Sequence, residues 1–117
     1  MKDITPVGLA GLVFYSPAAP ALTALLRDRV GVPLHPHRHG KLREHQEGLF
    51  SGVHFAIWEG SDARAVPTFR VPSLDEALAR ATASGIRALH APIDLGEGKR
   101  VVSLEAGGVE VRFIQIA

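Results

Sequence analysis

The feature that most constrains the fold of this chain is an internal repeat, in which the second half restarts the pattern of the first. In each half an apolar strand precedes a helix start marked by Pro or Ser, a helix and a closing glycine. The final strands also align, because residues 52–59 (GVHFAIWE) fall on residues 108–115 (GVEVRFIQ). A repeat of this size indicates that each half packs against the other. We therefore expect two similar units, at about 7–59 and 65–117.

Local patterns predict the elements of the first half. Residues 8–15 are apolar and end at Ser-Pro, which is typical of a buried strand. Residues 18–30 carry leucines at 3,4 spacing after two prolines and before Gly31, so they are predicted to be helical. The remaining elements are an extended segment at 32–39, a polar stretch at 40–48 that fits either strand or loop, and an alternating strand at 52–59.

The second half follows a linker at 60–65. Ser73 and Glu76 form a capping box, which predicts a helix that starts there and closes at Gly85. The predicted strands of this half lie at 66–71, 86–91, 99–105 and 109–116. The pattern predicts an α+β fold, and the alternative is an unrelated α+β sandwich whose halves match by chance.

Composition limits the kinds of partner. A chain of 117 residues that is 46% hydrophobic fits one compact domain over 1–117, and a homodimer would add burial. A net charge of +1, with one Trp and one Tyr, argues against nucleic-acid binding. Without cysteine, disulfides and thiolate chemistry are excluded. No apolar run is long enough to span a membrane and the N-terminus lacks a signal-peptide pattern, so a cytoplasmic protein is expected.

Four stretches resemble motifs of one known family. They are residues 24–32 (ALLRDRVGV), 69–77 (FRVPSLDEA), 83–85 (ASG) and 105–115 (EAGGVEVRFIQ). In their order and spacing they are similar to the glyoxalase, bleomycin-resistance and extradiol-dioxygenase proteins, the vicinal oxygen chelate superfamily. The resemblance implies two tandem βαβββ units that form a curled mixed sheet with an open cleft, and helices on the outer face.

The resemblance also implies where a metal would be bound. In metal-dependent members the ligands lie on the first and last strand of each unit, which corresponds here to Ala10 (or Gly11), Ala56, Val66 and Arg112. None of these side chains is a metal ligand, because Ala and Val lack a donor atom and a guanidinium stays protonated. The resemblance therefore predicts no metal and no other cofactor at the family positions. His54 and Glu110 each lie two positions from such a slot, on the same face.

Strand alternation predicts which side chains face the cleft. His54 and Trp58 are expected on one wall, and Glu110 and Arg112 on another. Arg112, with Arg70 on the fifth strand, suits a carboxylate or phosphate. Trp58 and Phe14 suit stacking on a flat ring. The alternatives are an ion pair between Arg112 and Glu110, and core packing or a dimer contact for Trp58.

Histidines are concentrated in one part of the chain, at His35, His37, His39, His45 and His54. The first three share a face if 32–39 is a strand, which would allow a nitrogen-only zinc, nickel or copper site. The alternative is a solvated polar strand and loop over the His-rich segment 35–45. His54 lies between apolar residues and is the best candidate for acid–base catalysis or a hydrogen bond to a ligand.

Three functions remain open from the sequence. The first is a metal-free member of this superfamily that binds a small anionic or aromatic molecule through His54, Trp58, Arg70, Glu110, Arg112 and Phe14. The second is a metal-dependent lyase or dioxygenase that uses a divalent metal on a displaced set drawn from His35, His37, His39, His54 and Glu110. The third is a structural or partner-binding domain without a ligand, in which any enzyme label would rest on fold analogy alone.

Overall fold

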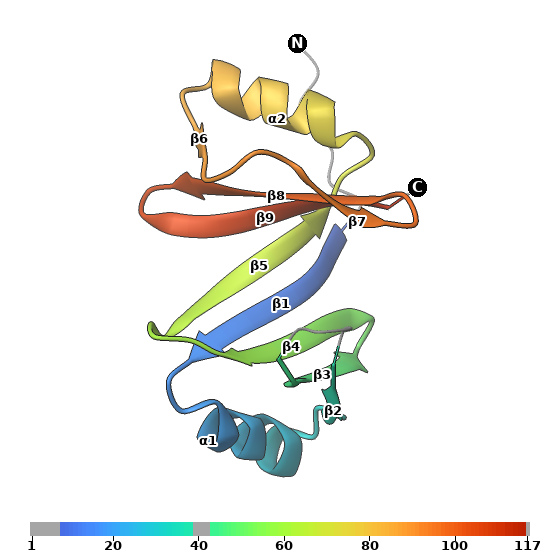
Figure 1. The fold of residues 1–117 in the computed structure, drawn as a ribbon, viewed down its shortest axis with the longest axis vertical. Helices are drawn as coiled ribbons and strands as arrows, with labels where there is room; N and C mark the ends of the chain where they lie inside the picture. The colour runs from blue at the N-terminus through green and yellow to red at the C-terminus, as the bar shows by residue number, and fades with distance from the viewer. Residues whose placement is uncertain (1–7, 39–42, 117) are drawn as a thin grey trace. The chain divides into compact units, whose positions relative to one another are not determined.

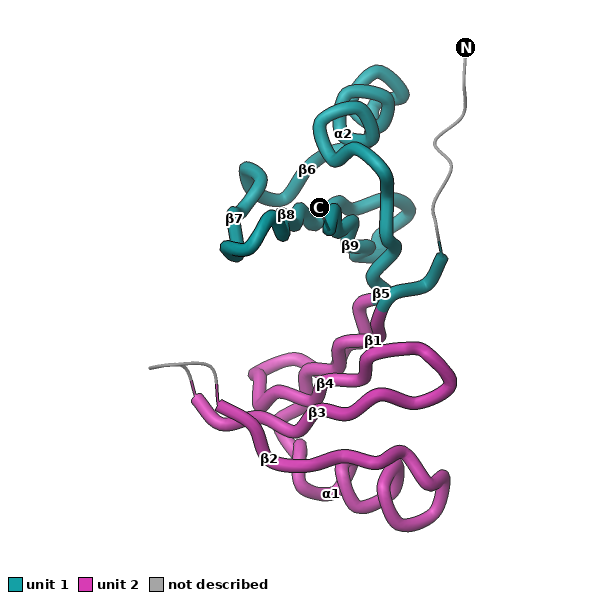
Figure 2. The backbone as a smooth tube through the Cα atoms, turned by 90° about the vertical axis from the view of Figure 1, so that its right-hand side faces the viewer, with its two compact units in different colours: residues 1–10, 67–117 teal, residues 11–66 magenta. Residues whose placement is uncertain are grey.

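The computed structural model describes residues 8–38 and 43–116. These residues form an α+β fold with a mixed sheet, which confirms the predicted fold class. The chain divides into two compact units, shown in different colours in Figure 2. Unit 2 is Gly11–Val66, and unit 1 is Met1–Ala10 together with Pro67–Ala117.

Unit 2 contains one βαβββ motif (Figure 1). Its elements are β1 (Gly8–Ser16, from Gly11 on), α1 (Ala19–Ala24), the π-helical turn η1 (Leu25–Val30), β2 (His35–His37), β3 (His45–Phe50) and β4 (Val53–Glu59). The strands lie in the order β2-β3-β4-β1. The β1–β4 pair is parallel, as a helical crossover requires, and the other pairs are antiparallel.

The helix of unit 2 covers one face of these strands. Pro20 lies in the first turn of α1, where its missing N–H is not needed. At the other end Gly31 adopts a left-handed φ of 93° and its N–H reaches the carbonyl of Leu26, so the last turn is wider than an α-helix. The predicted helix at 18–30 is therefore an α-helix followed by a π-helical turn. The core under it contains the buried side chains Val32, Leu34 and Ile57, with Phe14, Leu22, Leu26, Phe50 and Phe55 packed around them.

Unit 1 repeats the motif with an added edge strand. Its elements are β5 (Arg64–Arg70, from Pro67 on), α2 (Leu74–Ala83), β6 (Arg87–Ala88), β7 (Ile93–Gly96), β8 (Lys99–Ala106) and β9 (Val109–Ile116). The order is β5-β9-β8-β6, and β7 also pairs with β8. The β5–β9 pair is parallel and the β8–β9 pair is antiparallel. This arrangement corresponds to that of unit 2.

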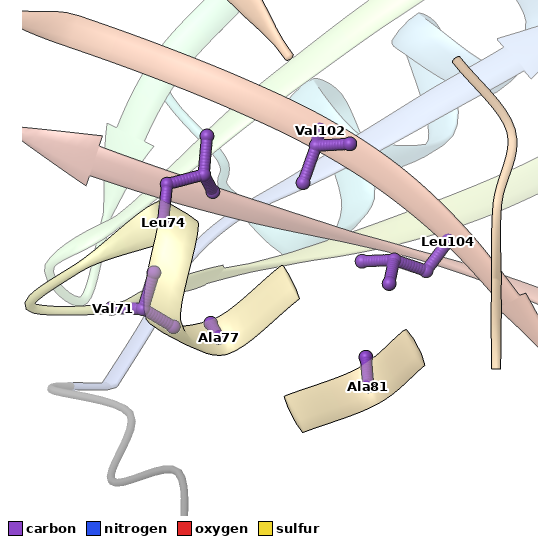
Figure 3. Close-up of a cluster of buried hydrophobic side chains, with 6 residues drawn as sticks. All are labelled: Val71, Leu74, Ala77, Ala81, Val102 and Leu104. Carbon is purple, nitrogen blue, oxygen red and sulfur yellow. The ribbon is translucent and has the colours of Figure 1, made fainter. Parts of the chain in front are cut away.

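The second helix begins as the sequence predicted. The Ser73 side chain accepts a hydrogen bond from the Glu76 N–H at 3.2 Å, which caps the first turn. Its apolar face packs on β8, and Leu74 of α2 and Val102 of β8 are both fully buried (Figure 3). At its start, the Leu74 N–H also donates to the Gln115 side chain on β9 at 2.7 Å, which ties the helix to the last strand.

Several predicted elements differ from the structure. The strand predicted at 86–91 is only the two-residue β6, because the chain turns away before Pro92. The strand β7 was not predicted, since its four residues are all exposed and its pairing with β8 is interrupted by a register shift. The ambiguous stretch at 40–48 becomes β3 from His45 on, and residues 39–42 lie outside the described part of the chain. Neither helix in the described ranges has the length and apolar character needed to cross a membrane.

Gly48 allows β3 to lie close to the segment that leads into β2. A Cβ added at Gly48 would lie 2.2 Å from the Pro33 carbonyl oxygen, which is backbone and cannot swing aside. We expect Gly48→Ala to lower the free energy of unfolding by about 2–3 kcal/mol, because the strands must separate to admit the methyl group. Urea unfolding measures this loss.

The matched control is Leu49→Ala, at the next position on the same strand, where the side chain is 63% exposed. We expect this change to stay within about 0.5 kcal/mol of the parent. Equal stabilities for the parent and Gly48→Ala would show that β2 and β3 are not held at this close approach.

Candidate functional site

A cluster of polar side chains covers the face of unit 2 opposite α1. In the strand register His35 pairs with Glu47, and Glu47 in turn pairs with Ala56. Directly paired residues lie on the same face of a sheet, and so do residues two apart on one strand. The face therefore carries His35 and His37 from β2, His45 and Glu47 from β3, and His54 and Trp58 from β4. The predicted alternation of β4 agrees, since Phe55 and Ile57 lie in the core under the helix.

Glu47 lies at the centre of this cluster. Its Oε2 is 2.9 Å from Nε2 of His45 and 3.6 Å from Nε2 of His54. Its Oε1 is 3.5 Å from Nδ1 of His37. The carboxylate side chain is 15% exposed and His45 only 2%, whereas His37 and His54 are open to solvent at 37% and 49%. One mostly buried carboxylate is thus shared by three imidazoles that come from three strands.

Opposing effects set the pKa of Glu47. Burial raises it, because a charged carboxylate loses solvent. The hydrogen bond from His45 and the charges of His37, His54 and His45 lower it. The imidazoles prevail, so the pKa of Glu47 lies below its ordinary value of 4.5 and the carboxylate is ionised at neutral pH.

His45 is fixed by an aromatic contact as well as by Glu47. Its ring stacks on Trp58, with centroids 3.9 Å apart and planes inclined by 11°. His37 meets the same imidazole edge-on at 5.6 Å, and His35 meets His37 edge-on at 6.4 Å. We call these four rings, Trp58, His45, His37 and His35, the ring ladder. It connects β4 to β2 across β3.

The cluster contains a set of donors that fits a metal ion. One ligand atom each from His35, His37 and Glu47 lies within 4.8 Å of the others. Donors that share a zinc ion lie about 2 Å from it and so up to about 4 Å from one another, which is a little closer than the 4.8 Å limit within which these three lie. Two imidazoles and one carboxylate are a donor set that first-row transition metals accept.

These three donors do not lie at the family's metal-ligand positions. Ala56 occupies the family slot on β4 and is 4% exposed, with no donor atom. Its direct cross-strand neighbour is Glu47, so the carboxylate lies one strand away from the slot. Sequence reasoning did not single out Glu47, because the polar stretch at 40–48 gave no clear strand register. The available signal was the alternation from His45 to Leu49, in which His45 and Glu47 share a face.

A second polar group lies in unit 1. Arg112 donates from Nε to the Ser103 hydroxyl at 3.2 Å, and one of its terminal nitrogens is 3.7 Å from the Glu110 carboxylate. Thr68 pairs with Arg112 on the other side, and its buried Oγ1 has no hydrogen-bond partner among the described residues. Arg70, two residues further along β5, is exposed. The ion pair between Glu110 and Arg112, which the sequence left open as the alternative to ligand binding, is therefore present, together with a hydroxyl that sequence reasoning did not name.

The other predicted site residues do not lie together at one site. Phe14, expected to stack on a ligand beside Trp58, lies in the core under α1 because it pairs with Ile57, which faces the helix. Trp58 has one ring face on His45, which matches the packing alternative more than an open ligand platform. His39 lies outside the described residues. His54 lies in unit 2 and Glu110 in unit 1.

Comparison with solved structures gives the fold. The chain is similar to methylmalonyl-CoA epimerase from Mycobacterium tuberculosis, with a TM-score of 0.72, 16% identity, and coverage of 100% of this chain and 93% of that one. A hypothetical protein from Bacillus halodurans matches with a TM-score of 0.73, 12% identity, and coverage of 93% and 94%. A Streptomyces coelicolor methylmalonyl-CoA epimerase variant in complex with 2-nitronate-propionyl-CoA matches with a TM-score of 0.70, 14% identity, and coverage of 97% and 99%.

No protein-family model and no curated protein matches the sequence. Identities of 12–16% establish the fold alone. The fold is of the βαβββ type found in the vicinal oxygen chelate superfamily, of which these epimerases are members. The superfamily that the sequence resemblance indicated therefore fits the structure.

The lowered pKa of Glu47 has a consequence for stability. A carboxyl group whose pKa is depressed by folding stabilises the protein fully above its unfolded-state pKa, and this contribution disappears as the pH falls through the folded-state value. We expect the melting temperature of Glu47→Gln to be lower than that of the parent at pH 6. The difference between the two melting temperatures should narrow as the pH falls below 4.5. Thermal melts of both proteins across this pH range, with Glu59→Gln as an exposed control, measure the effect. A gap that is constant from pH 6 to pH 3 would contradict the assigned charge on Glu47.

Proposed function

We propose that this chain is a metal-dependent enzyme of the vicinal oxygen chelate fold whose divalent ion is held by His35, His37 and Glu47. The observation that carries the proposal is the approach of these three donor atoms to within 4.8 Å of one another on one face of unit 2. It revises the displaced-ligand alternative of the sequence analysis, because it keeps His35 and His37 and replaces His54 and Glu110 with Glu47.

The donor types narrow the choice of metal. Two imidazoles with one carboxylate suit Zn²⁺ and Fe²⁺, and are less suited to Mg²⁺ or Ca²⁺, which prefer oxygen ligands. When bound, such an ion supplies Lewis acidity toward an oxygen of the substrate. The charge on Glu47 is already present at neutral pH, so binding does not have to remove a proton from it.

His54 lies beside the donor set and is the group on this face best placed to move a proton. Its ring is 49% exposed and its Nε2 is 3.6 Å from Glu47, so a molecule bound at the cluster can reach it from solvent. An imidazole changes its charge near neutral pH, which suits a general acid or base. Its part in the proposal is proton transfer, and metal binding is assigned to the other three residues.

The solved neighbours support a small oxygen-rich substrate. Two of these epimerase structures are complexes with methylmalonyl-CoA and with 2-nitronate-propionyl-CoA, and both molecules carry an anionic oxygen group near a carbonyl. We propose that the substrate here is likewise a small molecule with adjacent oxygen groups that a Lewis acid can polarise. A coenzyme A carrier is not part of the proposal, and a homodimer and a cytoplasmic location stay predictions.

Metal binding tests this function directly. Untagged protein stripped with EDTA is titrated with Zn²⁺ and with Fe²⁺ under anaerobic conditions, by calorimetry. We expect one ion per chain, and a loss of affinity of about 100-fold or more in His35→Ala, His37→Ala and Glu47→Gln, because each removes a ligand. His54→Ala is expected to stay within a few-fold of the parent.

Glu59→Gln is the matched control, since it neutralises an exposed carboxylate on the neighbouring strand β4. Its affinity should equal that of the parent. The proposal fails if the parent binds no stoichiometric ion, or if the three ligand variants bind as well as Glu59→Gln.

A second candidate function is binding of a small anion without a metal, and the polar group of unit 1 favours it. Arg112 occupies a family metal position and is held in place by the Ser103 hydroxyl. Its side chain is 21% exposed, and a partly buried guanidinium is a strong partner for a carboxylate. This function predicts that the anion still binds when EDTA has removed all metal ions.

Melting shifts with a panel of mono- and dicarboxylates and with phosphate, all in EDTA, test this candidate. We expect one class of anion to raise the melting temperature of the parent, and Arg112→Ala to lose the shift. Arg87→Ala is the control, because that arginine is 72% exposed and lies on another strand. A shift that survives Arg112→Ala, or no shift with any anion, would exclude Arg112 as the binding group.

A further inference from the structure

We propose that His45 is a positioning residue that holds the Glu47 carboxylate in place for the metal, and that Trp58 holds His45. The inference deepens the proposed function, because it explains how a donor on one strand is kept in reach of the two donors on another. It assigns a role to the most buried histidine of the cluster, which is not itself a member of the donor set.

His45 contacts Glu47 directly. The His45 side chain is 2% exposed, and its Nε2 lies 2.9 Å from Oε2 of Glu47, the shortest of the three imidazole contacts to this carboxylate. Because a carboxylate at neutral pH only accepts hydrogen bonds, the shared proton is on Nε2 of the imidazole. His45 therefore fixes one oxygen of Glu47, and the other oxygen remains directed toward His37 at 3.5 Å.

His45 is in turn held by neighbouring rings. Its ring lies flat against the Trp58 indole at 3.9 Å, so rotation of the imidazole about its bond to Cβ would break the stack. The edge-on contact with His37, at 5.6 Å, limits movement on another side. The ring ladder thereby sets the direction in which the N–H points.

The contact between His45 and Glu47 is expected to strengthen metal binding. Groups that hydrogen-bond to a metal ligand fix its orientation, and their loss typically lowers metal affinity by about 10–100-fold. Without His45, Glu47 can rotate toward solvent or toward His54, away from the donors on β2. A purely structural role for His45 predicts something different, since any flat ring that fills the same space against Trp58 would then serve equally well.

His45→Phe separates these two roles. Phenylalanine retains a flat ring for Trp58 but cannot donate a hydrogen bond to Glu47. We expect His45→Phe to bind Zn²⁺ about 10–100-fold more weakly than the parent, and its Co²⁺ derivative to show a shifted visible spectrum. We also expect a crystal structure of the metal-free variant to show the Glu47 carboxylate displaced from His37. His45→Gln retains an N–H donor and should recover part of the affinity.

Trp58 is tested by a matched pair. Trp58→Phe retains an aromatic face for His45, and we expect its Zn²⁺ affinity to be close to that of the parent. Trp58→Leu removes the aromatic face, and we expect its Zn²⁺ affinity to fall toward that of His45→Phe. The melting temperature of each metal-free variant shows whether it is folded. If His45→Phe does not fold, the Trp58 pair still tests whether the position of His45 controls Zn²⁺ affinity.

The outcomes are distinguishable from those of the proposed function. The inference is overturned if Glu47 keeps its place in metal-free His45→Phe, or if this variant binds Zn²⁺ as tightly as the parent. If the parent binds no metal, the proposed function fails, and displacement of Glu47 in the metal-free variant still supports the positioning role. Displacement of Glu47 together with weakened Zn²⁺ binding supports both.

Discussion

The candidate site depends on one mostly buried carboxylate and the imidazoles that surround it. Glu47 is 15% exposed, and a charge with so little solvent is stable only when it is paired. His37, His45 and His54 provide that pairing from three adjacent strands, so the cluster requires β2, β3 and β4 to be in register. The absence of a side chain at Gly48 lets β3 lie close to the segment that leads into β2.

The fold was largely predictable from local patterns. The alternation of residues 52–59 indicated which side chains of β4 face away from the helix, and the Ser73 capping box placed the start of α2. Both signals are local, because they depend on residues that are two or three apart. The short exposed strand β7 lacked such a signal and was missed.

The site was only partly predictable, for a physical reason. His35, His37 and His54 were named from the sequence, but the residue that joins them was not. Glu47 meets its partners through pairing between strands, and a polar stretch without clear alternation does not reveal that register. The stacking of Trp58 on His45 is likewise a contact between strands. Such contacts are visible only when the sheet is assembled.

The most direct test of the central claim is the location of a metal in the crystal. Protein crystallised with Zn²⁺ and without a histidine tag would be measured by anomalous diffraction at the zinc absorption edge. The account predicts one strong anomalous peak per chain, coordinated by His35, His37 and Glu47. A peak elsewhere, or no peak at this cluster at saturating Zn²⁺, would contradict it.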